Sequence, residues 1–129
     1  YRSHNYQITL FQRKVDKLMA AGYTYADAAA ETSRSIAIPG TSEHQLGLAV
    51  DIIDTKLWGL EEEQADLPGQ QWLMVHCHEY GFILRYPKDK IDKTGIIYEP
   101  WHYRYVGKHE AQKIYESGLC LEEYLASLS

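Results

Sequence analysis

The chain is predicted to fold as an α+β protein, in which helices pack on one face of a small, mostly antiparallel sheet. Helical spacing of apolar residues recurs along the chain, and short β-branched or aromatic runs lie between the helical segments. The composition, with 45% hydrophobic and 24% charged residues, is that of a globular protein. No repeat, low-complexity tract or linker divides the 129 residues, so we expect a single domain over 1–129.

The first part of the chain is predicted to form two helices. Apolar residues at helical spacing indicate a helix over 5–21, and Gly22 ends it as a C-cap. Thr24 or Tyr25 opens an alanine-rich second helix over 26–35. A short extended piece follows and stops at Pro39-Gly40.

The rest of the chain is predicted to supply the sheet and the remaining helices. The run over 48–53 is short, rich in β-branched residues and bounded by Gly47 and Asp54, so it predicts a mostly buried strand. The segments that follow are predicted in this order: an acidic loop at 55–69 with room for a helical turn, a helix at 70–80 closed by Gly81, a strand at 82–86 ended by Pro87, a hairpin loop or surface flap at 88–94, strands at 96–98 and 101–106, a helix at 108–117 and a last short helix at 121–128.

Charge and cysteine content argue against some classes of function. A net charge of −5 argues against a general nucleic-acid binder, since such proteins present a basic face. No stretch approaches the roughly 18 consecutive apolar residues that a membrane span needs. Cys77 and Cys120 are too few for a disulfide framework, and buried free thiols are favoured over a bond between them.

A histidine and an aspartate lie close together around the start of the first predicted strand. Asp51 sits inside an apolar run, where an ionised carboxylate needs a hydrogen-bonded partner or a cation. Ala49 shares its strand face and Gly47 comes just before, so this face carries small side chains. His44 lies on the preceding loop and can fold back toward Asp51 because Gly47 permits unusual dihedrals. Imidazole and carboxylate together suit a divalent metal such as zinc; the alternative is a turn-capping Asp and a surface His.

A second acid and histidine occur close together at Glu99 and His102. The aromatic run over 101–106 favours a strand, and Pro100 marks its start or an irregularity. With the first motif this gives two histidines and a carboxylate, the number of protein ligands that catalytic zinc keeps when water takes the fourth position. Glu99 is then left to act as a base on that water.

The pattern Ser-x-His-x-x-Gly-x-Ala-x-Asp, followed by Glu-x-x-His, resembles the signature of the LAS metallopeptidases, and within them that of the VanY-type D-alanyl-D-alanine carboxypeptidases. The two motifs are Ser42 to Asp51 and Glu99 to His102 in this chain. The likeness extends through Tyr1-Arg2-Ser3, Gln7, Pro39-Gly40, Trp72-Leu73, Tyr80 to Pro87, Tyr98 to Gly107 and Leu121 to Leu125. It implies a fold like that of the hedgehog and D-Ala-D-Ala peptidase group, with the metal site on the sheet face opposite the helices.

The resemblance implies a zinc centre with one ion per chain. Its ligands would be His44, Asp51 and His102, and Glu99 would be the catalytic base. Arg2 would polarise the substrate carbonyl, since guanidinium remains charged and directs several donors at one oxygen. The alternative for Arg2 is a disordered end residue.

Three further residues are expected to bind substrate: Ser42, Gln7 and Trp101. Each has an alternative role without substrate. Ser42 could form a turn, Gln7 could be a solvated helix residue, and Trp101 could belong to the core.

The function that the resemblance implies is removal of the C-terminal D-alanine from peptidoglycan stem peptides or their precursors, in the extracytoplasmic envelope of a bacterium. Alternatives on the same scaffold are a peptidoglycan endopeptidase and an L,D- or D,D-dipeptidase. A zinc-stabilised binding module without turnover is a further alternative, against which Glu99 and Arg2 argue. The chain opens on Tyr1-Arg2-Ser3 with no visible signal peptide, so we expect an export or anchor segment upstream in the full-length protein. Oligomeric state stays open.

Overall fold

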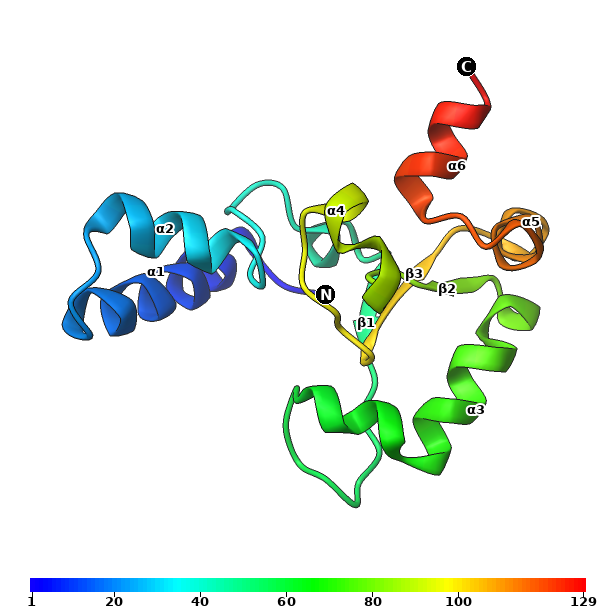
Figure 1. The fold of residues 1–129 in the computed structure, drawn as a ribbon, viewed down its shortest axis with the longest axis horizontal. Coiled ribbons are helices and arrows are strands. Elements are labelled where there is room, and N and C mark those ends of the chain that lie inside the picture. The colour runs from blue at the N-terminus through cyan, green and yellow to red at the C-terminus, as the bar shows by residue number, and fades with distance from the viewer. The chain divides into compact units, whose positions relative to one another are not determined.

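A computed structural model describes all residues from Tyr1 to Ser129 (Figure 1). The chain divides into two compact units, Tyr1–Gly47 and Leu48–Ser129. The single domain over 1–129 stays a prediction. None of the helices has the length and apolar character that a membrane crossing requires.

The first unit contains a helical hairpin. Its helices are α1 (His4–Ala20) and α2 (Tyr25–Ser33), which pack against each other and confirm the two predicted helices (Figure 1). Ser3 and Thr24 cap them, since each hydroxyl accepts a hydrogen bond from the backbone N–H three residues further on, at 3.2 Å.

The first unit ends in a tight turn that carries His44. Residues Glu43–Leu46 form a 3₁₀ turn, and the Gly47 N–H donates to the His44 carbonyl at 3.3 Å. Gly47 has φ of 70°, in the left-handed region where a side chain would be strained. Gly47 therefore adopts the unusual dihedrals expected of it, and it does so at the end of the turn that carries the predicted ligand His44.

The second unit contains a three-stranded antiparallel sheet in the order β1-β3-β2, as the α+β prediction requires. The strands are β1 (Ala49–Asp51), β2 (Phe82–Leu84) and β3 (His102–Tyr105), each shorter than predicted. Residues 96–98 form no strand, so that prediction is wrong. There the Thr94 hydroxyl bonds to the N–H and carbonyl of Ile96, at 3.2 and 3.3 Å, and satisfies the backbone locally.

Strand β1 is buried on one face only. Ala49 is 1% exposed, whereas Val50 and Ile52 are 39% and 37% exposed. The expected alternation of faces is confirmed, but the expectation of a mostly buried strand is wrong because the Val50 face is open. Asp51 lies on the buried side with Ala49.

The helices of the second unit follow the predicted pattern with one exception. They are α3 (Pro68–His76), α4 (Ile91–Thr94), α5 (Lys108–Ser117) and α6 (Leu121–Ser127). A 3₁₀ turn at Cys77–Tyr80 continues α3 to the predicted end, and another at Glu62–Asp66 supplies the helical turn of the acidic loop. The predicted hairpin loop or flap at 88–94 is wrong, because this segment forms a 3₁₀ turn, Lys88–Lys90, followed by α4.

Helices contact both faces of the sheet. Direct antiparallel partners share a face, so Ile83, Arg104 and His102 lie on one side. Ile83 packs into a core cluster with residues of α5 and α6, namely Ala111, Ile114 and Tyr124. On the other side the Tyr103 hydroxyl donates to Gln70 Oε1 of α3 at 2.8 Å. The α+β class is confirmed, but the expectation of helices on one face and the metal motifs on the other is wrong, because α5 and α6 pack on the face that carries His102 and α3 contacts the opposite face.

Candidate metal centre

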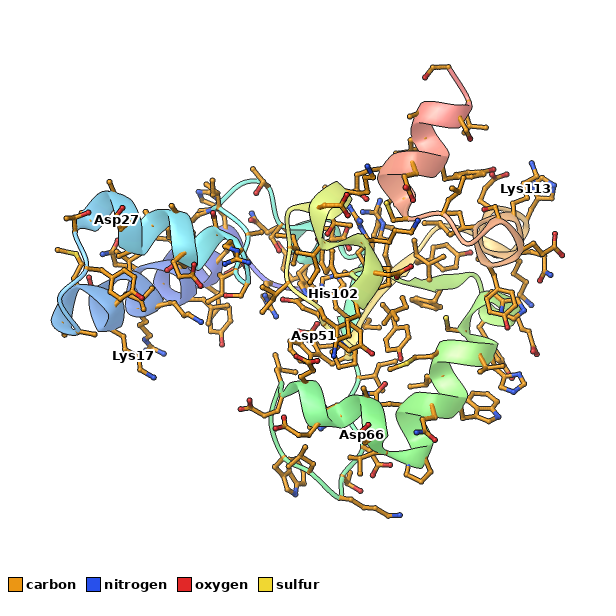
Figure 2. The ribbon with its side chains drawn as sticks, in the orientation of Figure 1. Lys17, Asp27, Asp51, Asp66, His102 and Lys113 are labelled. Carbon is orange, nitrogen blue, oxygen red and sulfur yellow. The ribbon has the colours of Figure 1, made fainter.

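Two of the predicted ligands lie opposite each other on neighbouring strands of the sheet. Asp51 of β1 and His102 of β3 are direct partners, and His102 Nδ1 lies 3.5 Å from Asp51 Oδ1 (Figure 2). Their side chains are 18% and 6% exposed, respectively. Two ligand atoms on a tetrahedral zinc ion, each about 2.0–2.2 Å from it, lie roughly 3.4 Å apart. The observed spacing therefore fits two ligands of one ion.

His44 completes the set of donors. The ligand atoms of His44, Asp51 and His102 all lie within 4.8 Å of one another. His44 is 5% exposed, so the surface histidine of the alternative interpretation is ruled out. Two imidazoles and one carboxylate supply the nitrogen and oxygen donors that zinc accepts, and three protein ligands leave a position open. The residues present therefore fit a catalytic divalent metal.

Glu99 lies beside this donor set. Its Oε2 atom is 3.3 Å from His102 Nδ1, and its side chain is 7% exposed. The His102 N–H donates to the Glu99 carbonyl at 3.2 Å, and the turn that this bond closes brings the two side chains together. A buried carboxylate at this distance can accept a proton near the metal without being needed as a ligand.

Arg2 is tied to the segment that carries His44. Its backbone N–H donates to the His44 carbonyl at 3.1 Å, and the residue is half-buried. This contact speaks against the alternative of a disordered end residue. The role of its guanidinium toward substrate stays a prediction.

The three predicted substrate-binding residues are all buried. Gln7 is fully buried and donates from Nε2 to the Ala37 carbonyl at 2.8 Å, which excludes a solvated helix position. Ser42 is 6% exposed, and its hydroxyl does not cap the 3₁₀ turn that follows. Trp101 is 8% exposed and accepts a hydrogen bond at its carbonyl from the Ile52 N–H at 2.8 Å. Its burial favours the core interpretation, and substrate contact by all three stays a prediction.

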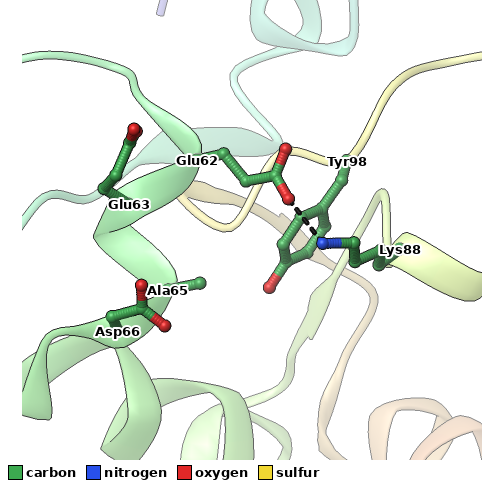
Figure 3. Close-up of a pocket in the computed structure, with 6 residues that line it drawn as sticks. All are labelled: Glu62, Glu63, Ala65, Asp66, Lys88 and Tyr98. Carbon is green, nitrogen blue, oxygen red and sulfur yellow. Dashed lines mark hydrogen bonds and ion pairs between the residues drawn. The ribbon is translucent and has the colours of Figure 1, made fainter.

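A separate hollow of about 430 Å³ lies along the acidic loop (Figure 3). It is lined by Glu62, Glu63, Ala65, Asp66, Lys88 and Tyr98. Lys88 Nζ lies 2.7 Å from Glu62 Oε1, and this hydrogen bond raises the pKa of the lysine. No histidine or cysteine lines this pocket, so it lacks the imidazole donors that His44 and His102 supply at the candidate metal centre.

The other histidines and the cysteines lie outside the candidate centre. His76 bonds to Glu79 at 2.7 Å and His109 to Glu110 at 2.6 Å, both on exposed helix faces. Cys77 and Cys120 are free and buried, as predicted. Burial raises the pKa of Cys77 to about 11, which makes its thiol a poor ligand or nucleophile.

The residues that surround His102 have no role that a sequence pattern predicts. Tyr86 packs its ring against the imidazole, and Arg85 lies over the Tyr86 ring. Arg85 in turn bonds to Glu122 of α6. The conspicuous run Tyr80 to Pro87 was the available signal, but no pattern in it points to a partner in a distant helix.

Proteins of known sequence resemble this chain over most of its length. The VanY family model, described as D-alanyl-D-alanine carboxypeptidase, matches residues 1–108. A D-alanyl-D-alanine carboxypeptidase of Enterococcus faecalis is 50% identical over 125 residues, which cover 97% of this chain and 45% of that protein. The chain thus spans about half the length of the curated relatives it matches.

Solved structures resemble it as well. VanYB in complex with D-alanine-D-alanine is 48% identical with a TM-score of 0.88, over 100% of this chain and 68% of that chain. A mutant of the vancomycin resistance D,D-pentapeptidase VanY in complex with Zn(II) is 49% identical with a TM-score of 0.83, over 97% of this chain and 67% of that chain. The LdcB LD-carboxypeptidase is 38% identical with a TM-score of 0.83, over 98% of this chain and 55% of that chain. The fold is therefore one that these peptidases share.

Proposed function

The chain belongs to the VanY family of D-alanyl-D-alanine carboxypeptidases, and on this premise we propose that it is the catalytic domain of a zinc-dependent D,D-carboxypeptidase. Its substrate is the peptidoglycan stem peptide or its precursor, from which it removes the C-terminal D-alanine. One observation carries the proposal: the ligand atoms of His44, Asp51 and His102 lie within 4.8 Å of one another, with Glu99 3.3 Å from His102.

These three side chains would hold the metal, one ion per chain. Zinc held there would act as a Lewis acid and would lower the pKa of a bound water to about 7, so that hydroxide would be available at neutral pH. The Asp51 Oδ1 and His102 Nδ1 atoms lie 3.5 Å apart, which suits two donors to one ion. The zinc complex of the related D,D-pentapeptidase supports this choice of metal.

Glu99 serves as the general base and then as the general acid. Its carboxylate takes a proton from the attacking water and returns it to the amine that leaves with the terminal residue. Burial of this side chain keeps bulk water from competing for the proton. The backbone bond between Glu99 and His102 holds acid and imidazole in one orientation.

Arg2 is proposed to stabilise the negative charge that develops on the carbonyl oxygen. Its attachment to the His44 carbonyl supports a position beside the metal ligand. Ser42 and Gln7 are proposed to orient the peptide by hydrogen bonds. Gln7 is fully buried and its Oε1 has no partner within the chain, so an N–H that reaches this oxygen would complete its hydrogen bonding. Trp101 is proposed as an apolar wall behind the peptide.

A second candidate function is cleavage of an L,D bond. The similarity of this chain to the LdcB LD-carboxypeptidase supports this candidate. The metal and base chemistry would be the same for both bonds, which differ in the residue before the scissile bond and in its configuration. A binding module without turnover needs no buried base, so Glu99 speaks against it. The chemistry of the substrate supports action in the cell envelope, outside the cytoplasm.

The test is digestion of three defined substrates by the zinc-loaded chain, with products weighed by mass spectrometry. These are a stem pentapeptide ending in D-Ala-D-Ala, a tetrapeptide ending in an L,D bond, and a cross-linked muropeptide. Loss of one D-alanine from the pentapeptide is expected. Cleavage of the tetrapeptide alone would favour the L,D assignment, and loss of the cross-link would identify an endopeptidase. Release of intact D-Ala-D-Ala would instead identify a dipeptidyl-carboxypeptidase, which cuts before the last two residues.

A further inference from the structure

The segment Arg85-Tyr86, which follows β2, bonds through its backbone to both parts of the second motif. The Arg85 N–H donates to the His102 carbonyl at 3.1 Å. The Tyr86 carbonyl accepts a hydrogen bond from the Glu99 N–H, also at 3.1 Å. The position of this one dipeptide therefore fixes the main chain of the proposed ligand and of the proposed base.

The Tyr86 side chain adds a contact with the ligand itself. Its ring meets the His102 imidazole edge to face, with centroids 4.8 Å apart and planes at 61°. The imidazole must keep Nδ1 toward Asp51 Oδ1 and Glu99 Oε2, at 3.5 and 3.3 Å. An aromatic ring packed against it in this geometry resists rotation of the imidazole away from those atoms.

Arg85 connects this contact to the C-terminal helix. Its guanidinium lies over the Tyr86 ring, 4.7 Å from the centroid. The same group donates two hydrogen bonds to Glu122, from Nη1 to Oε2 at 2.9 Å and from Nη2 to Oε1 at 2.6 Å. This bidentate arrangement is the strongest form of an arginine–carboxylate pair. The Arg85 side chain is only 11% exposed.

The charge state of Glu122 agrees with such a pair. Burial alone would raise the pKa of this carboxyl, but the hydrogen bond and charge of Arg85, together with smaller contributions from the Glu122 backbone and Cys120, lower the pKa overall. The helix that carries Glu122 is anchored in turn, because Tyr124 of α6 packs in the core cluster with Ile83. Glu122 is therefore a charged and fixed partner for Arg85.

We propose that Arg85 and Glu122 are positioning residues for the metal centre, which act through Tyr86 to hold the His102 imidazole in its ligand orientation. Glu122 lies beyond residues 1–108, the part of the chain that the family model matches. The C-terminal helix thereby contributes to the proposed zinc affinity without touching the metal. This inference rests on the proposed function, because it takes His102 as a zinc ligand.

The test compares Glu122→Gln with Glu123→Gln in the otherwise complete chain. The control lies next to it on α6 and loses a different ion pair, that of Glu123 with Lys90 at 2.9 Å. The metal-free proteins are titrated with zinc against a chelator of known affinity, and the absorption spectrum of the Co²⁺-loaded proteins is recorded. Loss of a partner that orients a metal ligand typically weakens metal binding between about 10-fold and 100-fold. We expect that loss, and a shifted Co²⁺ spectrum, in Glu122→Gln and not in Glu123→Gln.

Two further variants guard against a general loss of structure. Arg85→Lys keeps the positive charge but removes the paired geometry, so it should weaken zinc binding while circular dichroism stays native. Tyr86→Leu removes the ring that packs on the His102 imidazole, so it should also weaken zinc binding while circular dichroism stays native. Measurements are made at a temperature where each metal-free variant has the parent's helix content.

The outcomes separate the two proposals. Equal zinc affinity and equal Co²⁺ spectra in Glu122→Gln and Glu123→Gln would overturn the positioning role. If Glu122→Gln does not fold, native zinc binding by folded Arg85→Lys would overturn it as well. Failure of the unaltered chain to bind zinc would instead remove the proposed function on which this inference rests.

Discussion

Replacement of Glu99 by glutamine is the most direct test of the proposed mechanism. Glutamine has nearly the same volume as glutamate and can still accept a hydrogen bond, but it cannot take a proton near neutral pH. The backbone bonds of this residue, to Tyr86 at 3.1 Å and to His102 at 3.2 Å, do not involve the side chain. The substitution therefore removes the base and leaves the local fold in place.

The expected loss follows from the surroundings of the carboxylate. The Glu99 side chain is 7% exposed, so bulk water cannot easily replace it as the base. Its carboxylate lies 3.3 Å from His102 Nδ1 and is not one of the three proposed metal ligands. A positioned general base contributes about 10²–10⁴-fold to rate. Its loss corresponds to roughly 2.7–5.4 kcal/mol of barrier. We expect kcat/KM for D-alanine release to fall by that factor, while zinc content stays near one ion per chain.

The assay measures D-alanine released from the stem pentapeptide, together with zinc content by elemental analysis of the same samples. Glu79→Gln is the matched control, because that glutamate is exposed and pairs only with His76 on its own helical segment. Activity of Glu99→Gln within a few-fold of the parent would refute the role of Glu99 as base. Loss of zinc together with activity would make Glu99 a metal ligand, which would also contradict the mechanism.

Four further predictions concern the metal, the thiols, the pH dependence of stability and a buried polar group. Alanine at any one of the three proposed ligands should abolish zinc binding at micromolar metal, measured by calorimetry, whereas His76→Ala should bind zinc like the parent. The thiols of Cys77 and Cys120 should not react with a thiol reagent at pH 8 until denaturant is added, because both are buried and burial raises the pKa of each. Since the pKa of Cys77 rises from 9.0 to about 11, the folded chain keeps a proton that the unfolded chain releases, and stability to urea should fall as pH rises across that window. Tyr103→Phe should lower the free energy of unfolding by about 1–3 kcal/mol, since it leaves Gln70 Oε1 buried without its 2.8 Å partner. A melting temperature unchanged to within a degree would contradict that last prediction.

Much of this protein can be predicted from local sequence patterns. The helices at Lys108–Ser117 and at the start of the chain follow from apolar spacing and capping residues, which act within a few positions of one another. The same holds for the turn at His44, because Gly47 alone supplies the left-handed conformation that ends it. The identity of the candidate ligands also follows from sequence, since their residue types limit what they can bind.

The register of the sheet was decided by tertiary structure. That Asp51 pairs with His102 depends on two strands 51 residues apart in sequence, and a slip of one residue would turn one of these side chains to the opposite face. Local patterns also misplaced residues 88–94, which form helical turns in place of a loop or flap, and residues 96–98, where the Thr94 side chain satisfies the backbone in place of a sheet. No periodicity or motif predicts two of the contacts around the site, those of His102 with Tyr86 and of Arg85 with Glu122. They form only when the sheet and α6 pack together. Sequence therefore determined which chemistry is available, and packing determined which groups are held close enough to perform it.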